Sequence, residues 1–214
     1  MKIILLIPIY NDRESLKKLI ENINFEVKDL NSEMSVVVIN DASSQQIVDT
    51  YQNLENINSF EIINMKENRG HTRCIASGLK YIFEKKEFDF VIPMDGDGED
   101  RPEEIKNFIH QAKQSDDKTI VGERTKRSES LFFKICYQLH KLLTLGFTGH
   151  SINFGNFTCL SKSTIEKMLN EKATWNSFSG SLKKLEKDLL PTPSVRGIRY
   201  FGPSKMSFFN LLKH

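Results

Sequence analysis

Hydrophobic and polar positions alternate regularly over the first half of the chain. Short apolar runs, such as residues 2–7 and 34–39, are separated by a segment at 12–24 whose apolar residues recur at helical spacing. The runs predict strands, and the spaced segment predicts a helix. Further strands are predicted at 60–65, 88–94 and 119–122, and further helices at 70–84 and after Pro102. This alternation predicts an α/β fold with a Rossmann-like, largely parallel central sheet that has helices on both faces.

The pattern is less regular in the second half. A long helix is predicted for residues 128–147 and a strand pair or bent strand for residues 151–160. Helices are predicted for 162–170 and 178–189, and a last strand for Val195–Phe201. No repeat, low-complexity stretch or clear linker interrupts the chain, so we expect one domain for residues 1–214.

Composition removes several classes of protein. The 214 residues contain 30 Lys+Arg and 28 Asp+Glu, a net charge of +2, so no global charge argues for a nucleic-acid partner. The three cysteines (Cys74, Cys136 and Cys159) are far apart and odd in number, which indicates reduced, buried thiols in a cytosolic protein. The apolar run at Ile3–Ile9 is interrupted by Pro8 and is better explained by a buried strand than by a signal peptide.

An acidic loop follows the predicted strand that ends at Met94. Its sequence, Asp95-Gly96-Asp97-Gly98-Glu99-Asp100, places four carboxylates within six residues. A helix cap would need one acid, and unpaired carboxylates this close repel one another. Oxygen ligands at this spacing suit a hard divalent cation, and the chain does not continue into the twelve-residue calcium loop of an EF-hand. The loop therefore predicts a metal site.

Polar residues also follow the other predicted strands. Pro8-Ile9-Tyr10-Asn11 ends the first strand, Asn40-Asp41 ends the second, and Asn68–Arg73 precedes a helix. Ligands bind beyond the carboxyl ends of parallel strands, so these groups are expected at one site. Asn11 and Glu14 also form a candidate capping box. Neither GxGxxG after the first strand nor GxxxxGK[ST] is present, which argues against dinucleotide enzymes and P-loop NTPases.

Four segments taken together resemble a known family. They are IPIYNDRESL, VVVINDASS, NRGHTRCIASGL and MDGDGEDRPEEI, and they resemble the inverting GT-A glycosyltransferases of family 2. The later segments GERTKRSESLFFKICY, GNFTCLSK and RYFGPSKMSF look like the branch of dolichol-phosphate mannosyltransferases and bactoprenol glucosyltransferases. The resemblance covers nearly the whole chain. It implies a GT-A fold in which residues 1–123 bind the nucleotide sugar and residues 124–214 face the acceptor and the membrane.

The resemblance also implies roles for individual residues. The nucleotide sugar would be bound by Pro8, Tyr10, Glu14, Asp41, Arg73, Asp95 and Gly96. Asp95 and Asp97 match the DxD motif, and with Glu99 they would hold Mg²⁺ or Mn²⁺. The catalytic set would be Asp97, Arg124 and Lys205, and the acceptor phosphate would be bound by Arg127, Ser130, Lys134 and Arg199.

The chain departs from the family pattern in two places. Asn156-Phe157-Thr158 stands where the branch often has Asp-Phe-Arg, and no Glu-Asp pair that could supply a catalytic base is found between residues 150 and 190. A sugar hydroxyl needs such a base, whereas a lipid phosphate is already an anion and needs cations to bind it. A basic stretch with interspersed aromatic residues, Arg124–Lys141, suits an anionic lipid headgroup, although a solvated helix face would also explain it.

The sequence-based hypothesis is therefore transfer of a hexosyl unit from a UDP- or GDP-sugar to polyprenyl phosphate or another lipid-linked acceptor. The enzyme would be cytoplasmic and peripheral at the cytoplasmic face of the membrane. The apolar residues between Met206 and Leu212 predict an amphipathic helix at that surface, and related enzymes often continue there into a membrane anchor.

Three alternatives remain open at this point. The first is a family 2 enzyme that acts on a saccharide or glycolipid hydroxyl. The second is a nucleotidyltransferase, which would ordinarily have a Gly-rich basic loop after the first strand, where this chain has PIYNDRESL. The third is a binding module, which would have no use for the acidic loop.

Overall fold

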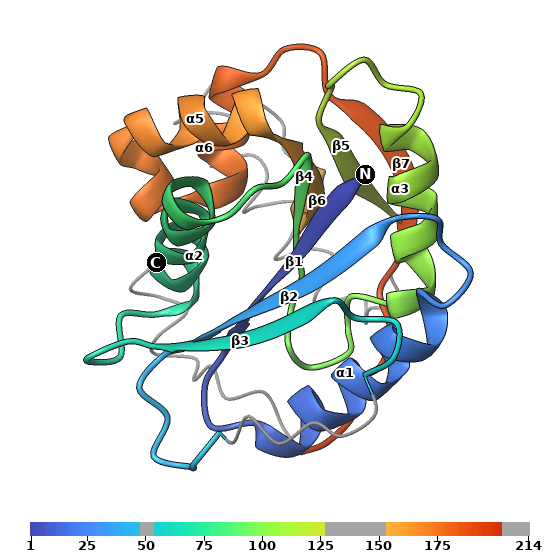
Figure 1. Ribbon diagram of the computed structural model, residues 1–214. Helices are drawn as coiled ribbons and strands as arrows, with labels where there is room; N and C mark the ends of the chain where they lie inside the picture. The colour runs from blue at the N-terminus through green and yellow to red at the C-terminus, as the bar shows by residue number, and fades with distance from the viewer. Residues whose placement is uncertain (48–53, 127–152, 203–214) are drawn as a thin grey trace.

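A single seven-stranded sheet forms the centre of the molecule. The structure, a computed structural model, describes residues 1–47, 54–126 and 153–202 (Figure 1). The strands are β1 (Lys2–Ile9), β2 (Glu33–Asn40), β3 (Ser59–Asn64), β4 (Phe90–Pro93), β5 (Ile120–Lys126), β6 (Phe154–Ser161) and β7 (Leu190–Val195). Their order is β3-β2-β1-β4-β6-β5-β7, and every pairing is parallel except the two that β6 makes. The largely parallel sheet is the predicted one, and strands from both halves of the chain join it.

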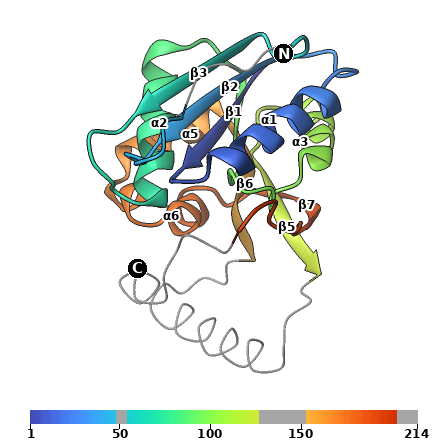
Figure 2. The same ribbon diagram turned by 90° about the horizontal axis from the view of Figure 1, so that it is seen from below.

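Helices cover both faces of the sheet, as predicted. They are α1 (Arg13–Glu26), α2 (His71–Lys85), α3 (Ile105–Ala112), α5 (Lys162–Asn170) and α6 (Phe178–Leu185), with 3₁₀ turns η1 (Pro102–Glu104) and η2 (Lys172–Trp175). Figures 1 and 2 show α1 and α3 on one face of the sheet and α2, α5 and α6 on the other. Each helix packs with its apolar side toward the strands, because side chains three or four apart share one face of a helix.

Strand β1 supplies both hydrophobic cores. Leu5 and Ile7 lie in the core beneath α1 and α3, while Ile4 and Leu6 lie in the core beneath α2, α5 and α6. Successive side chains of a strand point to opposite faces, so a strand buried on both faces is an uninterrupted apolar run. Two of the three cysteines, Cys74 and Cys159, are buried free thiols, as expected.

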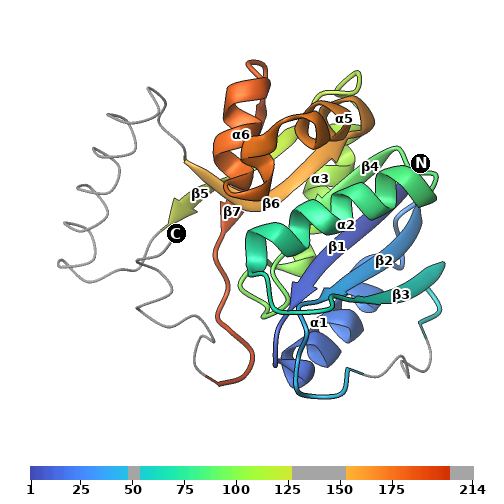
Figure 3. The same ribbon diagram turned by 90° about the vertical axis from the view of Figure 1, so that its left-hand side faces the viewer.

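The prediction of a strand at Val195–Phe201 is wrong. The strand is β7, which ends at Val195, and it contains Pro191 and Pro193. Leu190 donates its backbone N–H to Thr119, so the alternating proline nitrogens face away from β5, where a missing N–H costs no bond. Prolines discourage a strand prediction, yet the end of a sheet tolerates them. Residues 196–202 form an irregular segment, here named the arginine strap, which runs from β7 toward the start of α1 (Figure 3).

Two other boundaries differ from the predicted ones. Helix α6 ends at Leu185 and not at residue 189, and the strand pair or bent strand expected at 151–160 is the single strand β6 from Phe154. The helix predicted at 128–147 and the apolar segment at 206–214 lie outside the described residues. Within the described part of the chain, no helix combines the length and the apolar character that a membrane crossing requires.

Candidate active site

The carboxyl ends of β1, β2 and β4 meet at one edge of the sheet. Ile9 is in register with Asn40, and Leu6 is in register with Pro93. The acidic loop, residues 95–100, therefore leaves the sheet beside the chain that follows β1. Parallel strands bring these ends together as the sequence predicts, and open α/β sheets bind their ligands at such an edge.

The acidic loop is folded partly by its own carboxylates. Asp100, only 8% exposed, accepts the backbone N–H of Asp95 at 2.8 Å. Asp97 accepts the backbone N–H of Glu99 at 3.0 Å. Burial raises the pKa of Asp100 well above its usual range, and the charge of Asp95 raises it further. Burial and Asp95 also raise the pKa of Asp97. A nearby positive charge would therefore stabilise the ionised form of both carboxylates.

The arginine strap supplies that positive charge. Arg199 donates from Nη1 to Asp97 at 2.7 Å and from Nη2 to Asp12. Arg196 forms an ion pair with Glu99. Both arginines oppose the rise in the pKa of Asp97, and the contribution of Arg199 is the larger. Two arginines of the strap therefore neutralise two carboxylates of the loop.

Backbone contacts also join the strap to the loop. Gly197 donates its N–H to the carbonyl of Glu99 at 2.8 Å, and Tyr200 donates its N–H to the carbonyl of Asp97 at 2.9 Å. The Tyr200 ring lies against Gly98, where an added Cβ would be 2.4 Å from Cε2 of the ring. Gly98 also has φ +88°, which glycine adopts most readily. The strap is thus fitted to this loop by backbone bonds and by the absence of a side chain at residue 98.

Asp95 lies next to the first residue of α2. Its Oδ1 is buried and accepts no hydrogen bond from the described residues. Nε2 of His71, the first residue of α2, lies 3.3 Å from this oxygen, and Nδ2 of Asn156 lies 2.7 Å from the same ring nitrogen. His71 is thus the neighbour of this carboxylate oxygen, and Asn156 contacts the same ring nitrogen of His71.

The residues present fit a divalent cation in their chemistry. Hard cations prefer carboxylate oxygens, and Asp95 Oδ1 is a buried oxygen of this kind without a hydrogen bond. However, within the described ranges no three His, Cys, Asp or Glu side chains are gathered as a metal site. Asp97 and Glu99 instead pair their carboxylates with Arg199 and Arg196.

Asp41 lies at the end of β2 in a different setting. It is 3% exposed, and its two oxygens accept the backbone N–H groups of Arg69 at 2.7 Å and Gly70 at 2.9 Å. These bonds hold the loop that leads into α2. The carboxylate predicted to contact the nucleotide is therefore engaged by the protein backbone.

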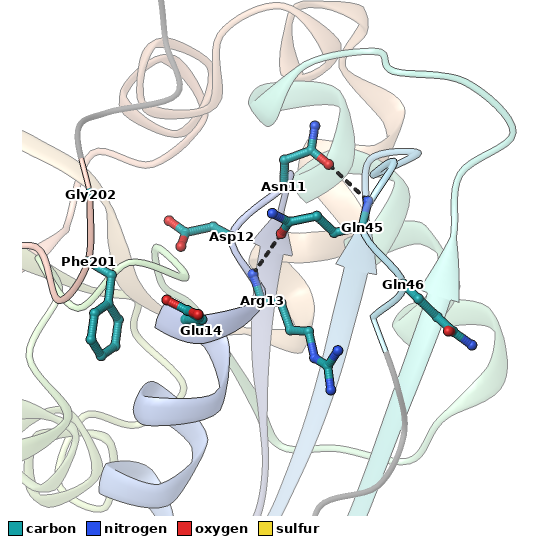
Figure 4. A pocket seen from close by; sticks show the side chains of 8 residues that line it. All are labelled: Asn11, Asp12, Arg13, Glu14, Gln45, Gln46, Phe201 and Gly202. Atoms are coloured by element: carbon teal, nitrogen blue, oxygen red, sulfur yellow. Dashed lines mark hydrogen bonds between the residues drawn. The ribbon is translucent and has the colours of Figure 1, made fainter.

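A cleft of about 490 Å³ opens beside the start of α1 (Figure 4). It is lined by Asn11, Asp12, Arg13, Glu14, Gln45, Gln46, Phe201 and Gly202. Its size is in the range of small-molecule sites. Asp12 lines the cleft and also pairs with Arg199, so the cleft adjoins the acidic loop.

The capping box predicted for Asn11 and Glu14 is wrong. Helix α1 begins after Asp12 without a side-chain cap. Asn11 has φ 49°, and its Oδ1 accepts the backbone N–H groups of Ser44 at 2.8 Å and Gln45 at 3.2 Å. Asparagine tolerates this left-handed conformation better than most residues. Asn11 consequently fastens the loop after β2 to the end of β1 and shapes one wall of the cleft.

The structure brings some of the predicted residues together and leaves others apart. Glu14 lines the cleft, and Gly96 packs against the carbonyl of Pro8. Tyr10 is 41% exposed at the end of β1, and Arg73 is exposed on α2. Arg124 lies on β5 against Gly155, and its charge opposes the rise in the pKa of Asp100. Arg127, Ser130, Lys134 and Lys205 lie outside the described residues.

Sequence reasoning missed four residues that shape the site: Asp12, Asn22, Arg196 and Tyr200. Asp12 and Arg196 pair with residues of the predicted site, and Asn22 donates to Tyr200 Oη at 2.9 Å. The one signal available is that the two arginines of the strap, like the acids of the loop, are closely spaced. Spacing of this kind does not say which residues meet.

Comparison with known proteins identifies the family. The Glycosyl transferase family 2 model matches residues 4–180. This chain belongs to glycosyl transferase family 2, which confirms the resemblance and the expected class of protein.

Two curated relatives have the same name, undecaprenyl-phosphate 4-deoxy-4-formamido-L-arabinose transferase. The protein from Photorhabdus laumondii subsp. laumondii is 30% identical over 227 residues, covering 99% of this chain and 65% of the relative. The protein from Proteus mirabilis is 28% identical over 225 residues, covering 99% and 64%. This chain thus spans a little under two thirds of the length of these relatives.

Solved structures confirm the expected GT-A fold. The mannosyltransferase PcManGT from Pyrobaculum calidifontis, in complex with GDP-Man and Mn²⁺, matches with a TM-score of 0.60 at 14% identity, covering 91% of this chain and 56% of that one. S. aureus TarS 1–349 in complex with UDP-GlcNAc matches with a TM-score of 0.52 at 18% identity, covering 78% and 47%. At such identities the similarity concerns the fold alone.

Proposed function

We propose that the protein is an inverting, metal-dependent glycosyltransferase that moves a glycosyl unit from a UDP- or GDP-sugar to polyprenyl phosphate. One observation supports this most directly. Carboxylates of the acidic loop and the guanidinium of Arg199 meet at the carboxyl edge of the parallel sheet, beside a cleft of about 490 Å³. Transfer from a nucleotide sugar needs this combination, because negative charge develops on the leaving diphosphate.

The donor would bind between the cleft and the acidic loop. Asp95 and Asp97 would hold Mg²⁺ or Mn²⁺, which acts as a Lewis acid toward the diphosphate when bound. Arg124 and Arg199 offer guanidinium groups, whose paired N–H donors match phosphate oxygens. The resemblance assigns Arg199 to the acceptor phosphate, and we propose a donor role instead because its guanidinium bonds to Asp97 and Asp12. Both arginines already lie within the electrostatic range of the acidic loop, as their effects on the pKa values of Asp97 and Asp100 indicate.

A phosphate acceptor agrees with the carboxylates of the second half. Between residues 153 and 202 the chain has Glu166, Glu171, Glu186 and Asp188. Glu171, directly after α5, pairs with Lys184 at 2.6 Å, and Glu186, directly after α6, pairs with Lys167 at 2.9 Å. Neither pair includes a residue of the acidic loop. A phosphate monoester needs no general base, whereas a sugar hydroxyl does.

The names of the relatives point to the same acceptor and broaden the range of sugars that the donor could carry. Their names specify undecaprenyl phosphate, a polyprenyl phosphate, and an arabinose derivative, which is a pentose. The sequence-based hypothesis specified a hexosyl unit, so the donor panel must contain both kinds of sugar. A lipid acceptor also supports the proposal that the enzyme is peripheral at the membrane, and the cytoplasmic face remains a further part of that proposal.

The test is a transfer assay with purified protein, UDP- and GDP-linked hexoses and pentoses, Mn²⁺ or Mg²⁺, and either undecaprenyl phosphate or a glycolipid hydroxyl as acceptor. We expect a sugar-phosphate-lipid product, detected by its mass, which disappears with chelator. Transfer only to the hydroxyl would move the protein to the alternative family 2 reaction. Metal-independent transfer would remove the role of the acidic loop.

The acceptor half has its own test. Neutralising the predicted phosphate-binding residues Arg127 and Lys134 together, as R127Q/K134Q, should raise the KM for undecaprenyl phosphate while leaving the KM for the nucleotide sugar unchanged. A matched variant, K17Q/K18Q, removes two exposed charges from α1. An equal effect of R127Q/K134Q on both KM values would take this stretch out of the acceptor site.

A further inference from the structure

The arginine strap places a cation on a residue that the proposed function reserves for a metal. Arg199 bridges Asp97 and Asp12, and the exposed fractions of the three side chains are only 16%, 19% and 10%. The Coulomb attraction between charges shielded from water to this extent is stronger than at the surface, although burial of the charges offsets part of it. The bridge therefore neutralises both carboxylates where they stand.

A divalent cation and Arg199 would compete for the same Asp97 oxygen. The Arg199 guanidinium is 2.7 Å from Asp97 Oδ2, and the other oxygen of this carboxylate accepts the N–H of Glu99. Two positive groups at contact distance repel each other strongly in a site shielded from water. A metal that binds Asp97 Oδ2 would therefore displace Arg199 from this oxygen.

Asp12 can hold Arg199 at the site during this exchange. Although Asp12 directly precedes α1, its carboxylate forms no cap with the helix and is paired with Arg199 instead. The strap backbone is anchored independently, because Gly197 and Tyr200 donate to backbone carbonyls and Tyr200 Oη accepts from Asn22. Only the Arg199 side chain needs to move.

We infer that Arg199 is an exchangeable counterion of the acidic loop. In the metal-free protein Arg199 pairs with Asp97. When the metal and the donor bind, Arg199 leaves Asp97 for the diphosphate of the donor, while Asp12 stays paired with it as a pivot. Asp12 is thus a positioning residue that acts through Arg199. This inference rests on the proposed function in one respect, namely that Asp95 and Asp97 bind a divalent cation.

The first experiment measures Mn²⁺ binding to the full chain without nucleotide, by calorimetry or by the EPR signal of free Mn²⁺. R199Q removes the competitor and should therefore tighten Mn²⁺ binding about tenfold or more, which corresponds to about 1.4 kcal/mol. R199K keeps a charge that cannot bridge two carboxylates as a guanidinium does, and it should give an intermediate affinity. R13Q is the matched control, because Arg13 lines the same cleft and forms no ion pair with a described residue.

The outcomes separate this inference from the proposed function. If R199Q binds Mn²⁺ no more tightly than the wild type, or if R13Q tightens binding equally, the exchange is refuted while metal binding by the acidic loop stands. If neither the wild type nor any variant binds Mn²⁺, with or without UDP or GDP, the metal-dependent function fails and the inference fails with it. Unchanged circular dichroism shows that each variant is folded.

The second experiment tests the pivot with a double-mutant cycle on the binding of UDP and of GDP in saturating Mn²⁺. D12N should weaken binding of the preferred nucleotide about tenfold, because Arg199 is no longer held toward the diphosphate. In the R199Q background, D12N should have little further effect. Additive losses from the two substitutions would show that Asp12 acts on the donor without Arg199, which would overturn its role as a pivot.

Discussion

Asp41 and Asp97 are two carboxylates at the same edge of the sheet, and they are held in opposite ways. Asp41 follows β2 and is bound by the backbone N–H groups of Arg69 and Gly70. Asp97 follows β4 and is bound by the side chain of Arg199 as well as by the N–H of Glu99. A backbone donor moves only together with its loop, whereas an arginine side chain can rotate away on its own. From this difference we expect replacement of Asp41 to affect stability more than replacement of Asp97, and replacement of Asp97 to affect metal binding more.

The position of an acid at a strand end therefore does not determine its role. Both residues satisfy the sequence pattern of a donor-binding acid, and both are largely shielded from water. The mobility of the partner distinguishes them. A carboxylate with backbone partners is expected to lower stability when replaced, and one with a side-chain partner is expected to lower activity.

The largest effect is expected from D97N. Removing this charge should lower metal-dependent transfer about a hundredfold or more, as losing one preorganised electrostatic group typically does. The free energy of unfolding should change by about 1 kcal/mol or less, because the neutral amide relieves repulsion from Asp95 and Arg199 keeps Asp12. Initial rates at several Mn²⁺ concentrations and urea unfolding measure the two quantities. Wild-type transfer by D97N would contradict the assignment of the acidic loop.

Asp41 should show the reverse balance. D41A leaves two backbone N–H groups without their acceptor and should lower the free energy of unfolding by about 3 kcal/mol. D41N keeps one acceptor oxygen and should cost less. Urea unfolding of both variants beside D97N tests the comparison directly. If D41A were as stable as D97N, the distinction between the two acids would be lost.

The smallest effect is expected where the strap meets α1. Y200F removes the hydroxyl that accepts from Asn22 Nδ2 and should lower the free energy of unfolding by about 1 kcal/mol. Because the Tyr200 backbone N–H still bonds to Asp97, Mn²⁺ affinity should stay at its wild-type value. A tighter Mn²⁺ affinity in Y200F would show that the whole strap moves during exchange, and not the Arg199 side chain alone.

The fold could be predicted from local patterns where those patterns are strong. The apolar runs of β1, β2 and β4 and the helical spacing in α1 and α2 identify a largely parallel sheet, and that sheet brings the strand ends to one edge. Strand β7 escaped prediction because its prolines are tolerated only at the end of a sheet, and its position there depends on the whole topology.

The site could be predicted less completely. The acidic loop is visible in the sequence, because four acids in six residues need a counterion. The identity of that counterion is not visible, because Arg199 is 102 residues away from Asp97 and only the path of the strap unites them. Asn11 was misjudged for a similar reason, since its amide bonds to a loop more than thirty residues away and not to its own helix.

The two prolines of β7 have a consequence for how the protein behaves in solution. A strand at the end of a sheet offers unpaired backbone donors on which another chain can add a strand, which is a common route to aggregation. Pro191 and Pro193 have no N–H to offer on that side. Alternate donors along β7 are therefore missing, and a second molecule has no continuous ladder to extend. The two prolines that prevented the prediction of β7 from the sequence thus also protect the sheet from self-association along this strand.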